Sequence, residues 1–498
     1  MRKQTKLVAV LSAAALLAIG ASMTSFAAGW TQEDDTWVYL DRDGDRVTEE
    51  WKKSGANYYW LNEDGEMAMD ALIEDDDDHY YVDANGVRVT NQWVSVENED
   101  DDDVDGKEVD VLWHYMGSSG KAYKANAGST FKKSTINGKK YFFDDAGHMV
   151  SGWTTDTDGA IYYLGGENEG WAYTAWQYLE IDEDIEDSYD DNEAWFYFQS
   201  SGKARRNERK YIGGKYYAFD ENGVLITDWQ EATPGGASVA TPSKIDLDPG
   251  ERSYYDINDG DQGSGWVYTY ADKDETGDEK WFYLISGENN RVFNANGKDS
   301  NGASAEKYTD GTSYDSTKTN VAARIIKGKT YLFDNKGQML TGVFKFDKAV
   351  SRGNSSDLKA GVYYFNKSSG SVEGQMVTGK TTITYDGDNY AYYFKEDGTA
   401  YRNIIKNGSA YDDLGVRIEA EDGNSNSIKY ISDIKGGLDI DGNHYTKGTI
   451  VVSSSGKVKK GTSTVTIDGT KYTVSGYLVT KAVDKDDDKV AVKFEEAE

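Results

Sequence analysis

The chain has no cysteine, only 3 prolines and only 4 histidines among its 498 residues. The absence of cysteine excludes disulfide bonds, thiolate metal sites and a cysteine nucleophile. Four histidines leave little material for zinc chemistry or a histidine base. The short motifs typical of serine hydrolases, zinc proteases, P-loop proteins and dinucleotide-binding proteins do not occur either. We therefore expect a non-catalytic protein with no metal site and no cofactor.

Basic residues are also scarce, because 54 Lys and Arg stand against 87 Asp and Glu, giving a net charge of −33. Binding a nucleic-acid backbone requires a basic face, so this balance argues against a nucleic-acid partner. An acidic surface suits an extracellular protein or one that binds cations.

Long apolar runs are confined to the N-terminus. Arg2, Lys3 and Lys6 precede an apolar run over residues 7–19, and Ser25-Phe26-Ala27 follows it as a cleavage site. This pattern predicts a secretory signal peptide over residues 1–27. The run is too short to span a bilayer, so we expect no membrane span after its removal. Loss of these three basic residues lowers the net charge by three, from −33 to −36.

The rest of the sequence is a row of repeats. Gly44, Gly65 and Gly86 follow one another at intervals of 21 residues, each preceded by an aromatic cluster and a short acidic or polar stretch. We interpret the cluster as a strand, the glycine as a turn with positive φ, and the next stretch as the second strand of a hairpin. A lone hairpin is marginal in water, so the units must stack. We predict an all-β, elongated solenoid of about a dozen stacked β-hairpin repeats of roughly 20 residues.

Composition changes along the chain suggest domain boundaries. All prolines fall between Pro234 and Pro249, and no tryptophan follows Trp281. We expect a signal peptide over 1–27, Trp-rich repeats over 28–231, and a Pro/Gly linker over 232–252. Degenerate aromatic repeats would follow over 253–430, and a Thr-, Val- and Lys-rich β region would end the chain over 431–498.

Gly29-Trp30 with Trp37-Val-Tyr39-Leu, and Gly152-Trp153 with Ile161-Tyr-Tyr163-Leu, resemble the choline-binding, or cell-wall-binding, repeat of Gram-positive surface proteins. The stretch 134–153 is equally similar to the glucan-binding repeats of streptococcal glucosyltransferases and to the receptor-binding repeats of clostridial toxins, and the stretch 324–344 also resembles the toxin type. The resemblance covers nearly all of the mature chain. It is specific for the fold and leaves the ligand open.

In choline-binding members, the resemblance implies a left-handed superhelix in which a quaternary ammonium lies in a cage of three or four aromatic rings between units. Strand alternation places residues i and i+2 on one face, so each aromatic cluster offers two walls. The leading Trp of a neighbouring unit would supply the third wall. The candidate ligand-binding residues are Trp37, Tyr39, Trp51, Tyr58, Trp60, Tyr81, Trp93, Trp113, Tyr115, Trp153, Tyr163, Trp176, Trp195, Tyr197 and Trp229.

The expected function is that of a secreted, non-catalytic protein of the cell surface or cell wall that docks on the choline of teichoic acids. A glycan-binding surface protein and a structural spacer or adhesin with a protein partner are the alternatives. Glycan binding or a stalk suits the tryptophan-free second half better than choline. Many of the rings must instead form the core between hairpins. The acidic stretch 41–45 spaces its carboxylates as a calcium loop does, but it reads better as a hairpin turn.

Overall fold

The computed structural model describes residues 28–99, 102–189, 191–231, 252–271, 277–287, 290–296, 299–309, 313–353, 355–484 and 494–498. The predicted signal peptide and all of the predicted linker except Arg252 lie outside the described residues. In the described ranges, no helix has the length and apolar character needed to cross a membrane. The chain divides into two compact units: unit 1 comprises Met1–Glu193 and Tyr197–Ala204, and unit 2 comprises Ala194–Phe196 and Arg205–Glu498.

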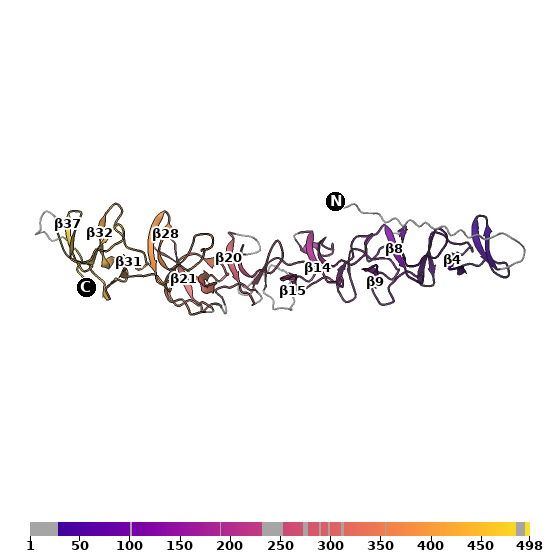
Figure 1. Ribbon diagram of the computed structural model, residues 1–498, viewed down its shortest axis with the longest axis horizontal. Coiled ribbons are helices and arrows are strands. Elements are labelled where there is room, and N and C mark those ends of the chain that lie inside the picture. The colour runs from indigo at the N-terminus through magenta and orange to yellow at the C-terminus, as the bar shows by residue number, and fades with distance from the viewer. Residues whose placement is uncertain are drawn as a thin grey trace. The chain divides into compact units, whose positions relative to one another are not determined.

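Unit 1 is a succession of antiparallel two-stranded hairpins that follow one another in chain order (Figure 1). The hairpins are β1 (Gly29–Glu33) with β2 (Thr36–Leu40), β3 (Glu50–Ser54) with β4 (Asn57–Leu61), β5 (Ala71–Asp75) with β6 (Asp78–Val82), β7 (Gln92–Glu97) with β8 (Val111–Met116), β9 (Lys132–Ile136) with β10 (Lys139–Phe143), and β11 (Trp153–Thr155) with β12 (Ile161–Tyr163). The division between the units falls within the next hairpin, which joins β13 (Ala175–Glu180) to β14 (Glu193–Phe198) around the 3-10 turn η1 (Glu186–Ser188).

Unit 2 continues with hairpins and adds larger sheets. Its two-stranded sheets are β15 (Glu208–Ile212) with β16 (Lys215–Phe219), β17 (Asp228–Glu231) with β18 (Arg252–Tyr255), β19 (Gly265–Thr269) with β20 (Lys280–Leu284), β28 (Gly379–Tyr385) with β29 (Asp388–Phe394), and β32 (Asn426–Tyr430) with β35 (Thr449–Ser453).

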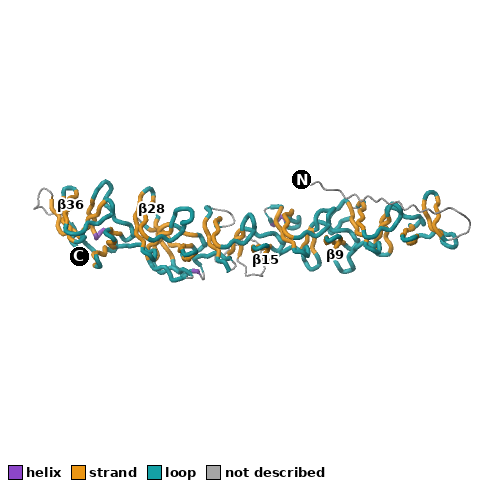
Figure 2. The backbone as a smooth tube through the Cα atoms, in the orientation of Figure 1, coloured by secondary structure: helices purple, strands orange, loops and turns teal. Residues whose placement is uncertain are grey.

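The larger sheets of unit 2 contain three or four strands. Their strand orders are β22 (Tyr314–Asn320), β21 (Ser304–Tyr308), β26 (Gly342–Phe346), β27 (Gly361–Phe365); β23 (Ala322–Ile326), β24 (Lys329–Phe333), β25 (Met339–Leu340); β31 (Ser409–Tyr411), β30 (Ile404–Lys406), β33 (Leu438–Ile440), β34 (Asn443–Tyr445); and β36 (Ser463–Ile467), β37 (Thr470–Ser475), β38 (Leu478–Asp484). The 3-10 turn η3 (Ile431–Asp433) follows β32, and Figure 2 shows how little helix accompanies the strands. The all-β hairpin prediction is confirmed.

The strand pairing within each repeat differs from the prediction. Trp60 in the aromatic strand β4 lies opposite Trp51 in the strand before it, across the tight turn at Gly55. After the Gly65 turn, the chain forms only an isolated bridge between Leu61 and Met67. The predicted hairpin through the Gly65 turn is therefore wrong, because Met67 donates its backbone N–H to Trp37 of the preceding hairpin.

The polar residue that begins the Gly65 turn has a structural role. Asn62 Oδ1 accepts hydrogen bonds from the backbone N–H groups of Asp64 (3.1 Å) and Glu66 (2.8 Å), an Asx turn that Gly65 completes with a φ of 72°. Asp41 makes the same bonds to the N–H groups of Asp43 and Asp45. This bonding explains the acidic stretch at 41–45, and no group of side chains within the described ranges is arranged to hold a metal ion.

One backbone hydrogen bond recurs where successive hairpins meet. The residue two positions after the turn glycine donates its N–H to a carbonyl of the preceding hairpin, as Met67 does to Trp37 (2.7 Å). The bond repeats as Arg88 to Tyr58, Ala122 to His79, Met149 to Trp113, Ala172 to Lys140, Ala204 to Ile161, Leu225 to Trp195, Gln262 to Tyr216, Met376 to Thr330, Ala400 to Val362, Arg417 to Ala391 and Val458 to Gly408. Within each unit, the hairpins are thus stacked in register.

Turn glycines also permit close packing between neighbouring repeats. Gly170 has a φ of 66°, and a Cβ built on it would lie 2.1 Å from Met149 Sδ. Gly374 repeats this arrangement in unit 2, with a φ of 70° and only 2.2 Å to Met339 Sδ. Any larger residue would strain the backbone and displace these methionines.

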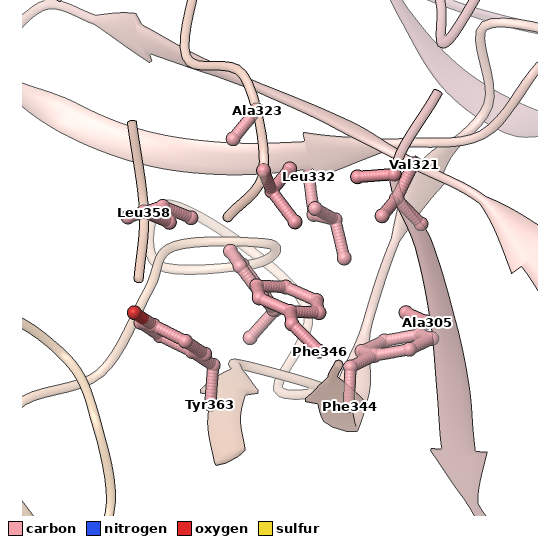
Figure 3. Packing of buried hydrophobic residues seen from close by; sticks show 11 residues of the cluster. Ala305, Val321, Ala323, Leu332, Phe344, Phe346, Leu358 and Tyr363 are labelled. Carbon is pink, nitrogen blue, oxygen red and sulfur yellow. The ribbon is translucent and has the colours of Figure 1, made fainter. Parts of the chain in front are cut away.

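In the tryptophan-free part of unit 2, aliphatic and aromatic side chains without an indole form the core. Figure 3 shows Val321, Leu332 and Leu358 packed around Phe346 and Tyr363. The Phe346 and Tyr363 rings are stacked with centroids 4.8 Å apart. Each such side chain contributes roughly 1.5–3 kcal/mol when fully buried. The tryptophan-free region is therefore stabilised by ordinary core packing.

Three histidines form a row across successive repeats of unit 1. The ring centroids of His79 and His114 are 6.3 Å apart, and those of His114 and His148 are 5.1 Å apart. His114 is completely buried. Burial, reinforced by the neighbouring His148 and His79, lowers the pKa of His114 to about 4.

We predict that acid destabilises unit 1 through His114. Its pKa is lower in the folded state than in the unfolded state, so the unfolded state binds more protons between about pH 6.5 and pH 4. The stabilisation is present above pH 6.5 and is lost as the pH falls through this window, by about 3 kcal/mol in total. His114→Phe should flatten the pH dependence of hydrogen exchange in β7–β10. The exposed His444→Phe is the control, and equal pH dependence in both variants would contradict the assignment.

Candidate functional site

Strand alternation sorts the aromatic residues of each hairpin onto two faces. In β8, Leu112, His114 and Met116 are buried on one face, whereas Trp113 and Tyr115 are half-buried on the other. Trp93 lies directly opposite Tyr115 in the ladder and therefore shares the face of Trp113 and Tyr115. Trp113 and Tyr115 lie on one face, as strand alternation predicts, but the Trp that shares this face comes from the same hairpin and not from a neighbouring one.

These rings form a cluster that we call cluster A: Trp93, Trp113, Tyr115, Tyr141 and Met149. The Trp93 ring centroid lies 6.4 Å from that of Trp113 and 5.2 Å from that of Tyr115, both edge to face. The next hairpin contributes Tyr141, whose centroid is 4.8 Å from that of Trp93. The Trp113 indole N–H donates to Asn168 Oδ1 (3.1 Å), which fixes the orientation of this outer ring.

Unit 2 contains a second copy, cluster B: Trp266, Trp281, Tyr283, Tyr331 and Met339. The Trp266 centroid lies 6.1 Å from that of Trp281, 5.3 Å from that of Tyr283 and 4.8 Å from that of Tyr331. A phenylalanine stacks behind the central Trp in both clusters, Phe143 at 5.7 Å and Phe333 at 5.8 Å. The two clusters therefore have the same geometry.

Cluster B borders a small open pocket. The pocket has a volume of about 180 Å³ and is lined by Trp266, Trp281, Tyr331, Met339, Gly370, Ser371 and Glu373. A larger groove of about 530 Å³ shares Trp281, Met339 and Glu373 with it and adds Asp278, Glu279 and Lys280, and Lys280 forms an ion pair with Asp278 (3.2 Å), so carboxylates remain in excess. Ring faces and carboxylates both attract positive charge, so this site suits a cation with an apolar shell.

One tyrosine of each cluster, Tyr141 and Tyr331, has a raised pKa. Burial raises the pKa of Tyr141, and it raises the pKa of Tyr331 although Gln375 forms a hydrogen bond with that side chain. They therefore contribute ring faces and dispersion contacts.

A third aromatic arrangement is already filled by a cation of the chain. The Arg88 guanidinium carbon lies 4.2 Å from the Tyr58 ring centroid, 5.3 Å from Trp51 and 5.8 Å from Tyr80. Arg88 forms no ion pair with any described carboxylate, and its buried Nε has no hydrogen-bond partner within the described residues. By contrast, no Lys or Arg of the described chain lies over Trp93, Trp113, Trp266 or Trp281.

The other predicted cage residues form smaller ring contacts. Tyr39 packs against Trp30 at 5.5 Å on the face that Trp37 shares, and Trp60 is nearly buried against Trp51 at 5.3 Å. The remaining pairs are Trp153 with Tyr163 (5.0 Å) and Trp176 with Tyr197 (5.1 Å). Tyr81 donates its hydroxyl to Asp70 Oδ1 and packs on the next hairpin, and Trp195 is 43% exposed.

Trp229 does not have the accessible ring that the sequence prediction gives it. The side chain is fully buried against Tyr254 and Phe282, and its indole N–H donates to the Tyr270 carbonyl (2.9 Å). The Arg252 guanidinium covers the ring at 4.0 Å. Trp229 is therefore a residue of the hydrophobic core of unit 2 and offers no open ring face to a ligand.

Sequence reasoning missed Trp266, Trp281 and Tyr331. The signal was visible, since Gly265-Trp266 and Trp281-Phe-Tyr283 repeat the pattern of the first half. The sequence prediction places cages only before the Pro/Gly linker, because no tryptophan follows Trp281. Trp30 and Tyr141 were also missed, because only the fold shows which neighbouring rings they approach.

Comparison with known proteins supports the repeat family. Residues 133–176 match the family described as "Choline-binding repeat", and residues 49–67 match the one described as "Putative cell wall binding repeat". The chain therefore contains repeats of the choline-binding and cell-wall-binding type, and the resemblance seen in the sequence is confirmed.

Individual relatives match only in part. Glucosyltransferase-S of Streptococcus mutans is 25% identical over 245 residues, which span 49% of this chain but only 14% of the relative. The solved structure of the modular autolysin LytC from Streptococcus pneumoniae is 17% identical with a TM-score of 0.34, and the match covers 63% of this chain and 52% of that one. The choline-binding domain of CbpL from the same organism is 27% identical, with coverage of 40% and 97% and a TM-score of 0.17.

We predict that Trp229→Ala destabilises unit 2 by about 3–5 kcal/mol, because it leaves a cavity and uncovers Arg252. Hydrogen exchange in β18 and β20 should become faster by the corresponding factor. Trp195→Ala, at an exposed ring of the same unit, should cost less than about 1 kcal/mol. Equal effects of the two substitutions would show that Trp229 is not a core residue.

Proposed function

We propose that this chain is a secreted, non-catalytic protein of the bacterial cell surface that docks on choline-bearing teichoic acids through aromatic cages. The observation that carries the proposal is the cluster B pocket, where two indoles, one phenol and a thioether surround a space next to the Glu373 carboxylate. Cluster A is the second cage.

The physical basis is the attraction between a cation and the negative faces of aromatic rings. Each ring contact contributes about 0.5–2 kcal/mol, and more when water is excluded. A trimethylammonium group is bulky and weakly hydrated, so it loses little solvation on entering such a cage. Arg88 supports the chemistry, because its guanidinium occupies a comparable set of rings without a carboxylate partner.

The net charge of the chain opposes approach to a polyphosphate. Net charges of −33 for the full sequence and −36 without the leader would repel teichoic acid at long range. That repulsion is screened beyond about 8 Å at physiological salt, whereas contact inside a cage is short-range. We therefore infer binding that strengthens as the salt concentration rises moderately.

There are two alternative functions. The same rings could bind a glycan, or the chain could act as a spacer or adhesin with a protein partner. Glycan binding would be favoured if the protein is retained on dextran or peptidoglycan and excess choline does not elute it. Hydrolysis of a cell-wall substrate would contradict the non-catalytic assignment.

The test is equilibrium dialysis of the full chain with radiolabelled choline, which reports the number of sites. We expect Trp281→Ala and Trp113→Ala each to remove one site, because each takes one wall from a cage. Tyr211→Ala, at an exposed ring outside both clusters, is the matched control and should keep every site. The neutral analogue 3,3-dimethylbutan-1-ol should compete about tenfold more weakly than unlabelled choline. Failure of either Trp variant to change the stoichiometry would overturn the assignment of its cluster.

A second prediction concerns the cage filled by Arg88. Arg88→Ala removes the internal cation from Trp51, Tyr58 and Tyr80, and we expect one additional choline site by the same dialysis. Arg88→Lys should restore an internal ammonium and should not add a site. An unchanged stoichiometry in a folded Arg88→Ala protein would mean that these rings collapse onto one another.

A further inference from the structure

A second kind of groove lies elsewhere in unit 1. It has a volume of about 590 Å³ and is open to solvent. We call it the lysine groove, after its lining by Lys139, Lys140, Trp171, Tyr173, Gln177 and Ser200. Its size is in the range of small-ligand sites. Nothing in the choline proposal uses it.

The charge of the lysine groove is opposite to that of the chain. Its lining contains two lysines and no carboxylate, although the sequence carries 87 acidic residues against 54 basic ones. Neither Lys139 nor Lys140 forms an ion pair with a carboxylate of the described residues. The nearby Glu169 accepts a hydrogen bond from the Tyr173 hydroxyl (2.7 Å) and does not line the groove. Neither lysine is therefore neutralised by a carboxylate of the described residues.

Both ammonium groups are held by neutral partners. Lys139 Nζ lies 2.9 Å from the centroid of the Trp171 ring. Lys140 Nζ donates a hydrogen bond to the Ser201 carbonyl (2.7 Å). A ring face and a carbonyl position a cation but do not neutralise it, so each lysine retains its charge for an incoming anion.

The rest of the lining suits a ligand rich in hydroxyl groups. Thr135, Thr174, Ser200 and Gln177 line the groove together with the rings of Trp171 and Tyr173. The Gln177 amide donates to the Thr174 carbonyl (2.9 Å), which fixes the orientation of this side chain. A sugar ring presents both apolar C–H faces and hydroxyl edges, and this mixed lining can contact both.

We propose that the lysine groove binds an acidic saccharide whose negative group, a carboxylate or a phosphodiester, pairs with Lys139 and Lys140. The groove shares no lining residue with cluster A, although its Trp171 packs against Tyr141 of that cluster with ring centroids 6.5 Å apart, and the proposal goes beyond the choline function. It would give the chain a contact with the sugar or phosphate part of a surface polymer.

The test is calorimetry of the full chain at low salt with trigalacturonate, a phosphodiester-linked oligosaccharide and neutral isomaltotriose. We expect binding of at least one anionic probe, and which of them binds identifies the source of the charge. The Lys139→Gln, Lys140→Gln double variant should weaken that binding at least tenfold. Lys132→Gln, an exposed lysine on β9 outside the groove, should change it less than twofold.

A second variant tests the groove without changing either lysine, so the conclusion does not depend on the folding of the double variant. Ser200→Trp keeps both lysines and fills the groove, so it should also weaken binding at least tenfold. Saturating choline should not displace the anionic probe, which separates this proposal from the cage proposal. No binding of either anionic probe, equal binding of isomaltotriose, or equal binding of a hexaglutamate peptide would overturn it.

Discussion

A two-stranded hairpin cannot bury both of its faces, and the rest of this structure depends on that constraint. Each repeat must cover its aromatic face with the next repeat, as Trp30 is covered by Tyr59 of the following hairpin. The recurring backbone bond from the residue after each turn, such as Met67 to Trp37, sets the register of this stacking. Turn glycines such as Gly170 then allow the next repeat to approach closely.

Ligand cages and core packing are therefore two outcomes of the same arrangement. The equivalent face has a different fate in different repeats. The Arg88 guanidinium covers it in one repeat, it is buried at Trp229 in another, and it is open to a pocket at Trp266 and Trp281 in a third. Ring identity alone does not distinguish these outcomes, since all of them involve a tryptophan facing further aromatic rings. What decides is whether the neighbouring repeat supplies a side chain that fills the space.

The chain's excess of negative charge is distributed unevenly over its candidate sites. Carboxylates such as Glu373 border the cluster B pocket, whereas the lysine groove has Lys139 and Lys140 and no acid in its lining. Many of the other acidic residues serve local structure, as Asp41 does by accepting backbone N–H groups in its turn. Acidic residues therefore have two roles: some accept backbone N–H groups in turns, and others favour a cationic ligand at the cluster B pocket.

The sequence by itself determined the all-β class, the repeat, the glycine turns and the pairing of faces, as at Trp113 and Tyr115, because these follow from local propensity and strand alternation. It did not determine that β4 pairs with β3, that Arg88 fills a cage, or that Trp229 is buried. Those properties depend on contacts with a neighbouring strand or repeat. Only the tertiary structure decided them, because the exposure of a ring is set by what packs against it.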